Sequence, residues 1–224
     1  MIASGQVAEL RIGRIALLPN AGRGGAGIMT GFRKSPVTGP VAAGISGLFG
    51  DEQGNLRVHG GPEKAIYGYP LSGYAGWQAE FPDLAHQLVA GAMGENLVVT
   101  GQDEASICIG DIIRCGTALL QISQIREPCS TFAAVHGTAR VVRAMTRSGR
   151  CGWYYRVLEP GQIAAGDSHD VIERPNPGWS IARFAGFAAG RAGTRDAIAE
   201  LTTLPGLTPA WQARAARALA EQMD

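Results

Sequence analysis

The sequence has few charged residues and very little lysine. Charged residues make up 17% of the 224 residues, and the formal net charge at pH 7 is +1. Of the 20 basic residues only Lys34 and Lys64 are lysines. A balance so close to neutral does not indicate a nucleic-acid-binding or membrane-binding surface. We therefore expect neither nucleic acid nor a membrane among the partners.

Long apolar runs are also absent. No stretch reaches the roughly 18 apolar residues that a transmembrane helix needs. The first residues, MIASGQVAELRIGR, contain Glu9 and lack the apolar core of a secretion signal. Apolar residues still make up 46% of the chain, enough for the core of one large domain or of a domain with an appendage. These features predict a cytoplasmic globular protein.

The four cysteines lack the spacing of a zinc-binding or redox pair, and disulfides are not expected in a reducing compartment. Cys108 and Cys115 stand among alternating apolar residues, so we expect both to be buried as small hydrophobic side chains. Cys129 differs, because it lies in the polar run Arg-Glu-Pro-Cys-Ser-Thr. Three alternatives are open for it: a packed side chain, half of a disulfide, or a thiolate that binds a metal or carries a sulfur atom.

Short strands separated by turns dominate the pattern from residue 41 to 175, and alternation is also clear over 7–18. Residues 105–125 predict a hairpin that turns at Gly116. Two helices are expected to interrupt the strands, around 71–88 and 130–148. The pattern is typical of a mainly β fold with inserted helices, either a barrel or a sandwich.

One glycine motif is misleading. Gly22, Gly24 and Gly27 nominally match the fingerprint of a dinucleotide-binding fold. That fingerprint requires a helix that begins at its last glycine, and here Gly31 and Pro36 follow and would break a helix. We predict a glycine-rich loop instead.

The composition changes at residues 173–178, where a proline-rich junction precedes a helical unit. Ser180 and Thr194 are expected to cap two helices, and Thr208 a third that starts with proline. The chain is therefore predicted to contain a β domain over 1–175 and a three-helix domain over 176–224.

Four polar segments interrupt the strand pattern and are candidates for chemistry. They are PNAGRG to FRK (19–34), VHGGPEKA (58–65), MGENL (93–97) and REPCST (126–131). If they converge, they form a pocket with a thiol, an imidazole, several cations and exposed backbone amides. Such a pocket suits an anion that carries a soft metal or a sulfur atom.

Cys129 is the candidate for reactivity in that pocket. Arg126 and the start of the expected helix at 130 would both lower the pKa of its thiol. Gly60 and Gly61 would let the backbone approach a ligand and leave N–H groups for phosphate. The residue type alone leaves His59 open as a ligand, a proton donor or a core side chain.

Several blocks, in this order, resemble the MOSC domain family (molybdenum cofactor sulfurase C-terminal domain). They are GDEQ (50–53), VHGGPEKAIYGYP (58–70), MGENLVVTG (93–101), CIGDIIRCGTALLQISQIREPC (108–129) and GWYYRVLEPG (152–161). They are most similar to the YiiM-like branch, bacterial proteins linked to resistance to 6-hydroxylaminopurine. The resemblance covers about residues 10–175, and the small helical domain of that branch matches 177–224.

The resemblance implies a β-barrel that binds molybdenum cofactor, a molybdopterin, with Cys129 as the metal ligand. It implies a reductase of N-hydroxylated compounds that takes electrons from a separate flavin or iron–sulfur protein, while the cofactor carries the redox change. His59 and Asn96 would orient cofactor or substrate. The expected contacts to the pterin and its phosphate are Arg23, Lys34, Gly60, Gly61, Lys64, Glu95 and Arg126. The chain departs from the family pattern at Gln124-Ile125-Arg126 and at Thr131, where relatives often carry lysine.

Two other functions are open. Cys129 could carry a persulfide and transfer sulfur, or the protein could bind and deliver molybdenum cofactor without catalysis. Pyridoxal phosphate is not expected, because only Lys34 and Lys64 could form a Schiff base and no large pyridoxal-binding domain is present. The three-helix unit could dock the electron donor or form a homodimer.

Overall fold

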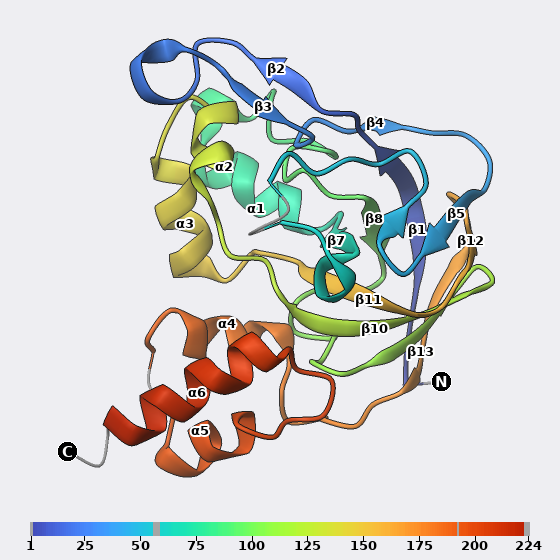
Figure 1. Cartoon of the computed structure of the whole chain (residues 1–224), viewed down its shortest axis with the longest axis vertical. Helices are drawn as coiled ribbons and strands as arrows, with labels where there is room; N and C mark the ends of the chain where they lie inside the picture. Colours follow the sequence, from blue (N-terminus) through green and yellow to red (C-terminus); the bar gives the residue numbers. More distant parts are fainter. Residues whose placement is uncertain (1, 56–58, 192, 222–224) are drawn as a thin grey trace.

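The computed structural model describes residues 2–55, 59–191 and 193–221. Seven of its strands form a closed barrel in the order β13-β9-β10-β11-β7-β8-β1, which β1 and β13 close by pairing antiparallel (Figure 1). These strands are β1 (Ala3–Ile12), β7 (Ile66–Pro70), β8 (Leu97–Thr100), β9 (Ile112–Cys115), β10 (Ala118–Ile125), β11 (Trp153–Glu159) and β13 (Ser168–Glu173). Closure leaves none of these seven strands with an unpaired edge. The predicted β fold is confirmed as a barrel, and β9 and β10 form the predicted hairpin at Gly116.

Six smaller strands among the described residues lie outside the seven strands of the barrel. The hairpin of β2 (Ala16–Leu18) and β3 (Ile28–Thr30) carries the glycine loop, which contains one 3-10 turn, η1 (Arg23–Gly25). Strand β3 begins directly after Gly27, so no helix starts there and the rejection of the dinucleotide motif is confirmed. The remaining strands are β4 (Ser35–Pro36), β5 (Val41–Gly44), β6 (Gly47–Leu48) and β12 (Gly161–Ile163).

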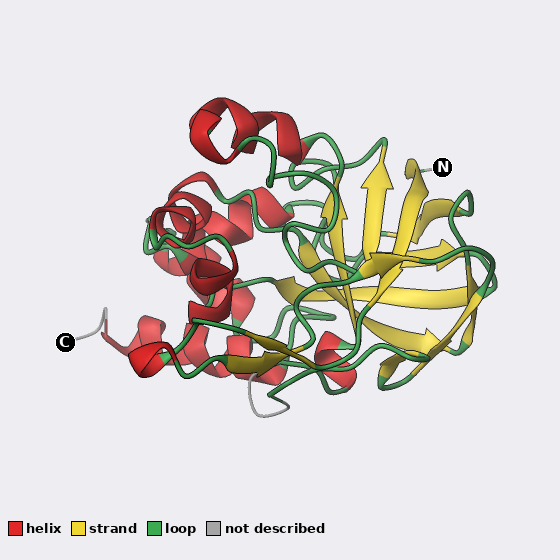
Figure 2. Ribbon diagram, turned by 90° about the horizontal axis from the view of Figure 1, so that it is seen from above, coloured by secondary structure: helices red, strands yellow, loops and turns green. Residues whose placement is uncertain are grey.

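The helices gather on one side of the barrel (Figure 2). Around 71–88 the chain forms α1 (Gly73–Glu80) and a 3-10 turn, η3 (Pro82–Leu84), rather than one long helix. The helix predicted over 130–148 is also divided, into α2 (Ser130–Val135) and α3 (Arg140–Ser148). The single-helix prediction was wrong because Gly137 adopts a left-handed φ of 67° between them. A further 3-10 turn, η2 (Pro62–Lys64), precedes β7.

The C-terminal segment forms α4 (Ile181–Ala188), α5 (Arg195–Leu201) and α6 (Pro209–Glu221). Two of the three predicted caps are confirmed: the Ser180 hydroxyl accepts from the Arg183 backbone N–H at 3.2 Å, and the Thr194 hydroxyl accepts from that of Ala197 at 3.2 Å. Helix α6 begins at Pro209 as predicted, but the Thr208 hydroxyl is buried without a hydrogen-bond partner among the described residues, so the predicted Thr208 side-chain cap is wrong. The unit is joined to the barrel side by a backbone hydrogen bond from Ile181 to the Ile107 carbonyl, 2.8 Å long.

The apolar core continues across the predicted junction at 173–178. Barrel residues such as Trp153 and Leu120 belong to the same buried cluster as Phe184 and Trp211 of the C-terminal helices. The division of the chain at residue 175 therefore stays a prediction. Within the part of the chain that the structure describes, no helix has the length and apolar character needed to cross a membrane.

Candidate functional site

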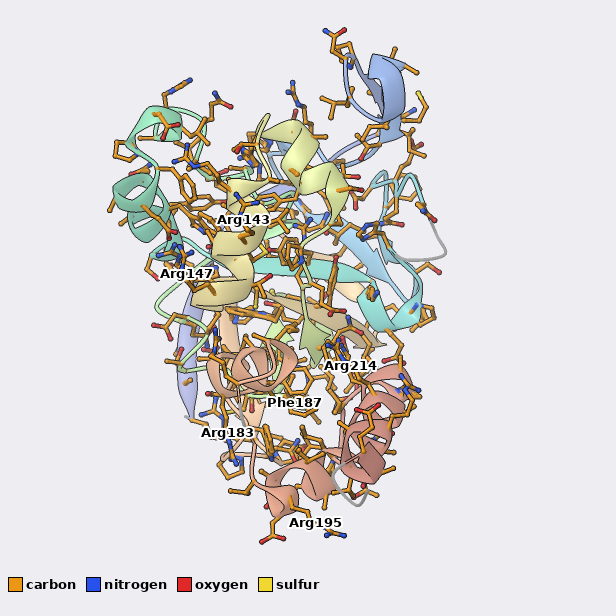
Figure 3. All side chains as sticks on the ribbon, turned by 90° about the vertical axis from the view of Figure 1, so that its left-hand side faces the viewer. Arg143, Arg147, Arg183, Phe187, Arg195 and Arg214 are labelled. Atoms are coloured by element: carbon orange, nitrogen blue, oxygen red, sulfur yellow. The ribbon has the colours of Figure 1, made fainter. Side chains whose placement is uncertain are left out.

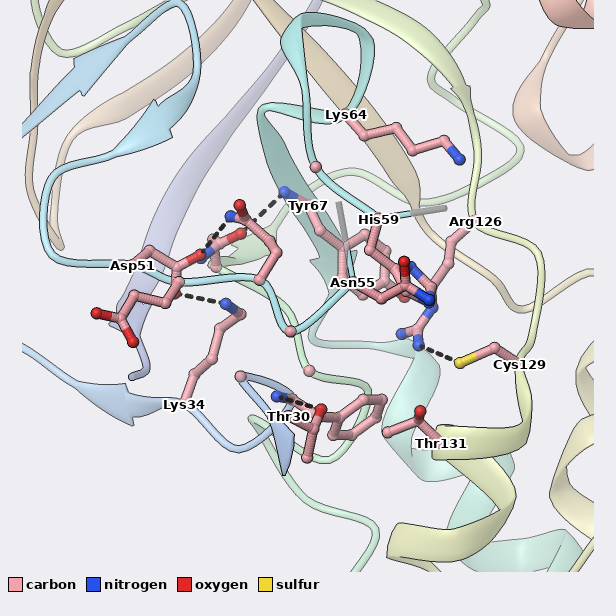
Figure 4. Close-up of a pocket in the computed structure, with 18 of the residues that line it drawn as sticks. Thr30, Lys34, Asp51, Asn55, His59, Lys64, Tyr67, Arg126, Cys129 and Thr131 are labelled. Carbon is pink, nitrogen blue, oxygen red and sulfur yellow. Dashed lines mark hydrogen bonds and ion pairs between the residues drawn. The ribbon is translucent and has the colours of Figure 1, made fainter. Parts of the chain in front are cut away.

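A cavity opens between the β2–β3 hairpin and the segment that follows β10 (Figure 4). We call it the front cavity. Its volume is about 110 Å³. Its walls include residues from all four polar segments: Phe32 and Lys34; His59, Gly60 and Lys64; Gly94 and Asn96; and Arg126, Cys129 and Thr131. The expected convergence of these segments is what the structure shows.

Cys129 lies at the end of the segment that leaves β10. Pro128 cannot donate a backbone hydrogen bond to a sheet, and the chain turns there into α2, which Cys129 precedes in an extended conformation. Burial raises the pKa of its thiol. The hydrogen bond with the His59 side chain, the charge of Arg126 and the Phe132 backbone N–H outweigh burial and lower the pKa to about 6. Cys129 is therefore mostly a thiolate at pH 7.

The other three cysteines differ sharply from Cys129. Cys108, Cys115 and Cys151 are at most 3% exposed, and burial raises the pKa of each thiol. The expectation that Cys108 and Cys115 are buried is confirmed. All four cysteines are free thiols in the structure.

Arg126 is fixed beside the thiolate. Its Nη2 lies 4.0 Å from the Cys129 sulfur, and its Nη1 donates to the Met93 carbonyl. Three aromatic rings surround the guanidinium within 6 Å: Phe32 at 5.1 Å, Tyr67 at 4.9 Å and Phe132 at 5.7 Å from its carbon to the ring centroids. The residue is 4% exposed, and its Nε has no hydrogen-bond partner among the described residues. The Arg126 guanidinium therefore acts mainly on the Cys129 thiolate.

Lys34 reaches the front cavity as half of an ion pair. Its Nζ lies 2.5 Å from Asp51 Oδ1, and the two side chains are 6% and 1% exposed. The Asp51 carboxylate also accepts the Gly13 backbone N–H at 2.8 Å. Burial lowers the pKa of Lys34, although Asp51 opposes this. The charge of Lys34 is therefore already balanced before any phosphate arrives.

The segment before β7 contributes one wall. Gly60 and Gly61 adopt φ values of 83° and 80°, conformations that favour glycine. Gly60 and Lys64 line the cavity, whereas Gly61 precedes η2 and is not among the lining residues. Burial lowers the pKa of Lys64, and the charge of Glu127 raises it in part.

Glu95 lies beneath the cavity rather than in its wall. It is fully buried, and its carboxylate accepts hydrogen bonds from the Tyr74 hydroxyl, from the Gly91 N–H at 2.6 Å and from the Met93 N–H at 3.1 Å. Burial raises its pKa, and these donors oppose the rise. The geometry gives Glu95 the role of holding the 91–95 turn, whose Met93 carbonyl binds Arg126.

Asn96 lines the cavity, but its amide serves the backbone. Its Oδ1 accepts the Tyr67 N–H at 3.1 Å, and its Nδ2 donates to the Arg11 carbonyl at 3.1 Å. It thereby ties β1 to β7 next to the site. The side chain of Arg23 lies outside the described residues.

Sequence reasoning missed several cavity residues. Asp51 and Gln53 belong to a short polar run between glycines, which was a usable signal. Phe32, Tyr67 and Tyr154 carried no local signal, because aromatic side chains in strand-like patterns usually pack in the core. In the described part of the chain, no group of three or more His, Cys, Asp and Glu side chains could hold a metal ion.

The fold and the site together define a β-barrel protein with an activated cysteine in a partly cationic cavity. The chain belongs to the MOSC domain family, whose model matches residues 55–170.

Among curated proteins, the chain is 35% identical over 178 residues to Protein YiiM of Escherichia coli, covering 80% of this chain and 79% of that one. It is 36% identical over 202 residues to a protein named Reductase of Gibberella moniliformis, covering 90% of this chain but only 35% of that longer protein.

Solved structures agree with this assignment. YiiM of Geobacillus stearothermophilus matches with a TM-score of 0.79 and 29% identity, over 96% of this chain and 99% of that one. YiiM of Escherichia coli matches with a TM-score of 0.76 and 30% identity, over 84% of this chain and 89% of that one. The chain is therefore a YiiM-like member of the family.

Proposed function

We propose that this protein is a molybdenum-cofactor-binding oxidoreductase that reduces N-hydroxylated compounds, such as 6-hydroxylaminopurine, to amines. The observation that carries the proposal is the Cys129 thiolate, which lines an open polar cavity beside a fixed arginine. The similarity to relatives named Reductase and Protein YiiM supports the proposal that this protein is a reductase. A separate donor protein would supply the electrons.

The residues of the front cavity fit a molybdopterin. A thiolate is a preferred ligand of soft metals, and the unpaired Arg126 Nε is a buried donor suited to an anionic group. The Gly60 backbone and Lys64 add contacts suited to a phosphate. Because the Lys34 ammonium already pairs with the Asp51 carboxylate, Lys34 would donate a hydrogen bond to a bound ligand but would add little net positive charge to the cavity.

The reaction would take two electrons and two protons per turnover. The N–O bond of R–NH–OH breaks, and R–NH₂ and water form. When bound, molybdenum cofactor supplies the two-electron change. Cys129 would bind the metal, and the Arg126 charge would keep its sulfur deprotonated. The His59 hydrogen bond to that sulfur would fix the orientation of the thiolate.

The test measures cofactor and activity together. Protein made in a molybdate-fed host is analysed for molybdenum, for pterin fluorescence after oxidation, and for turnover of 6-hydroxylaminopurine with a reduced viologen dye. We expect near-stoichiometric molybdenum and turnover, both lost in Cys129→Ala. A fully active Cys129→Ala variant would refute the assignment. Cofactor binding without turnover by any reductant would favour the delivery function. A mass increase of about 32 Da on Cys129 that dithiothreitol removes, without metal, would favour sulfur transfer, because a sulfinic acid of the same added mass is not reduced by thiols.

A further inference from the structure

The helical side of the molecule presents an arginine-rich surface (Figure 3). We call it the arginine face. It lies over α3, α4, α5 and α6, and its exposed members are Arg143, Arg147, Arg183, Arg191, Arg195 and Arg214. Neither α3 nor α4 contains an acidic residue, whereas α5 carries Asp196 and Glu200 and α6 ends at Glu221. The excess of positive charge on this side therefore lies over α3 and α4.

Part of this charge is balanced and part is not. Arg147 pairs with Glu80, and Arg214 pairs with Glu127. Among the described residues, Arg143, Arg183 and Arg195 form no ion pair with an acidic side chain. The partly exposed Phe187 on α4 lies among these arginines, so the face also has a small apolar area. Exposed cations around a small apolar centre are typical of a surface that recognises an acidic protein.

A second cavity, the rear cavity, opens within this face. It offers about 60 Å³ and is lined mostly by apolar residues of α3, α4 and the segment after β10, among them Met145, Ala185 and Ala188. Arginines of the face bind its rim. Arg214 donates to the Ala188 carbonyl at 3.2 Å and to Glu127 at 2.9 Å, and both acceptors belong to residues that line the cavity.

The two cavities are separated by one stretch of chain. Arg126 lines both of them, Pro128 lines the rear cavity and Cys129 lines the front cavity. Because Pro128 and Cys129 are consecutive residues, the segment that carries the thiolate also forms part of the wall of the rear cavity. Electron transfer slows steeply with distance, which makes the back of this segment a favourable point of approach for a donor.

We propose that the arginine face docks an acidic electron-carrier protein, with the carrier's redox group held over the rear cavity. The inference rests on the proposed function and specifies its missing partner. A face of this charge steers an acidic carrier toward the site and accelerates association, with modest affinity and strong dependence on salt. Small, weak interfaces are usual for redox partners.

The experiment reverses charge on the face. The variant Arg143→Glu/Arg183→Glu is compared with Arg14→Glu/Arg114→Glu, which changes the net charge equally on the barrel side, where Arg14 is exposed and Arg114 is partly exposed and paired with Glu159. The neutral variant Arg143→Gln/Arg183→Gln serves if the reversal impairs folding. Turnover is driven by a plant-type [2Fe–2S] ferredoxin, by a flavodoxin, and by a reduced viologen dye, which needs no docking.

We expect carrier-driven kcat/KM to fall about 10-fold or more in the face variant at roughly 50 mM salt, and the gap to close near 500 mM. Dye-driven turnover should stay within about twofold of the parent protein, since neither arginine lines the front cavity. Equal loss in both double variants, or no loss in the face variant, overturns the inference.

Binding separates this inference from the proposed function. If the dye drives no turnover, the proposed function fails, and titration calorimetry with each oxidised carrier then tests docking alone. Weaker binding by the face variant than by the control supports the inference. Failure of both carriers to bind the parent protein, or tighter binding of a single-stranded oligonucleotide than of either carrier, overturns it.

Discussion

The activated thiol makes a prediction that depends on one hydrogen bond. The His59 side chain is the strongest influence that lowers the pKa of Cys129, which is about 6 in the parent protein. His59→Leu removes this donor and leaves the opposing effect of burial in place. We expect the pKa of Cys129 to rise to about 7–8, because Arg126 and the Phe132 N–H still favour the thiolate.

The magnitude follows from the fraction of thiolate. At pH 5.5 a thiol of pKa about 6 is about 24% ionised, and one of pKa about 7.5 is about 1% ionised. The variant should therefore alkylate more slowly at acidic pH. At pH 9 both thiols are largely ionised, and the variant should react about 4–5 times faster, because a more basic thiolate is a better nucleophile. The two pH profiles should cross.

The assay follows iodoacetamide alkylation of metal-free protein by intact mass from pH 5 to 9. The three buried cysteines should contribute little, and Cys129→Ser measures their background directly. A parent midpoint near pH 8.5–9, or an unchanged midpoint in His59→Leu, would refute the reasoning about this site.

Four further predictions concern stability, each measured by denaturant unfolding. The pKa of the Cys129 thiol is about 6 in the folded protein and about 8.5 in the unfolded chain. The free energy of unfolding therefore rises with pH between these two values, and the thiolate no longer stabilises the fold as the pH falls through 6. From pH 6 to pH 8 we expect a gain of about 1–2 kcal/mol, absent in Cys129→Ser, after allowing for partial exposure. Lys34→Met should lower the free energy of unfolding by about 3–5 kcal/mol, because it leaves the buried Asp51 carboxylate without its cation, and adding Asp51→Asn should restore part of that loss. If the losses of the two single variants simply add in the double variant, the two side chains are not coupled. Glu95→Gln should lower the free energy of unfolding by about 1–3 kcal/mol, because an amide nitrogen cannot accept the hydrogen bonds that one carboxylate oxygen accepts. An unchanged free energy of unfolding would mean that the 91–95 turn does not depend on the Glu95 carboxylate. Ser180→Ala should cost about 1 kcal/mol by removing the α4 cap, whereas Ser180→Gly should cost only a few tenths.

Local features were predictable where the forces that make them act within a few residues. The Ser180 and Thr194 caps each involve a backbone N–H three residues ahead, and both were predicted from residue type. The turn at Gly116 was predicted in the same way, from two alternating runs separated by a glycine. The prediction of one helix over 130–148 was wrong for a related local reason. The pattern of apolar residues favoured a helix, but Gly137 adopts a left-handed conformation that interrupts it.

By itself, the sequence determined the strand-rich pattern, the Ser180 and Thr194 helix caps and the order of blocks that resemble the MOSC domain family. It also singled out Cys129, because a cysteine between proline and serine does not suit a strand. Only the tertiary structure decided what surrounds that sulfur. The guanidinium of Arg126 contacts the ring of Phe32, which is 94 residues earlier in the sequence, and Lys34 pairs with Asp51, which is 17 residues later. Such contacts depend on closure of the barrel, which no local pattern encodes.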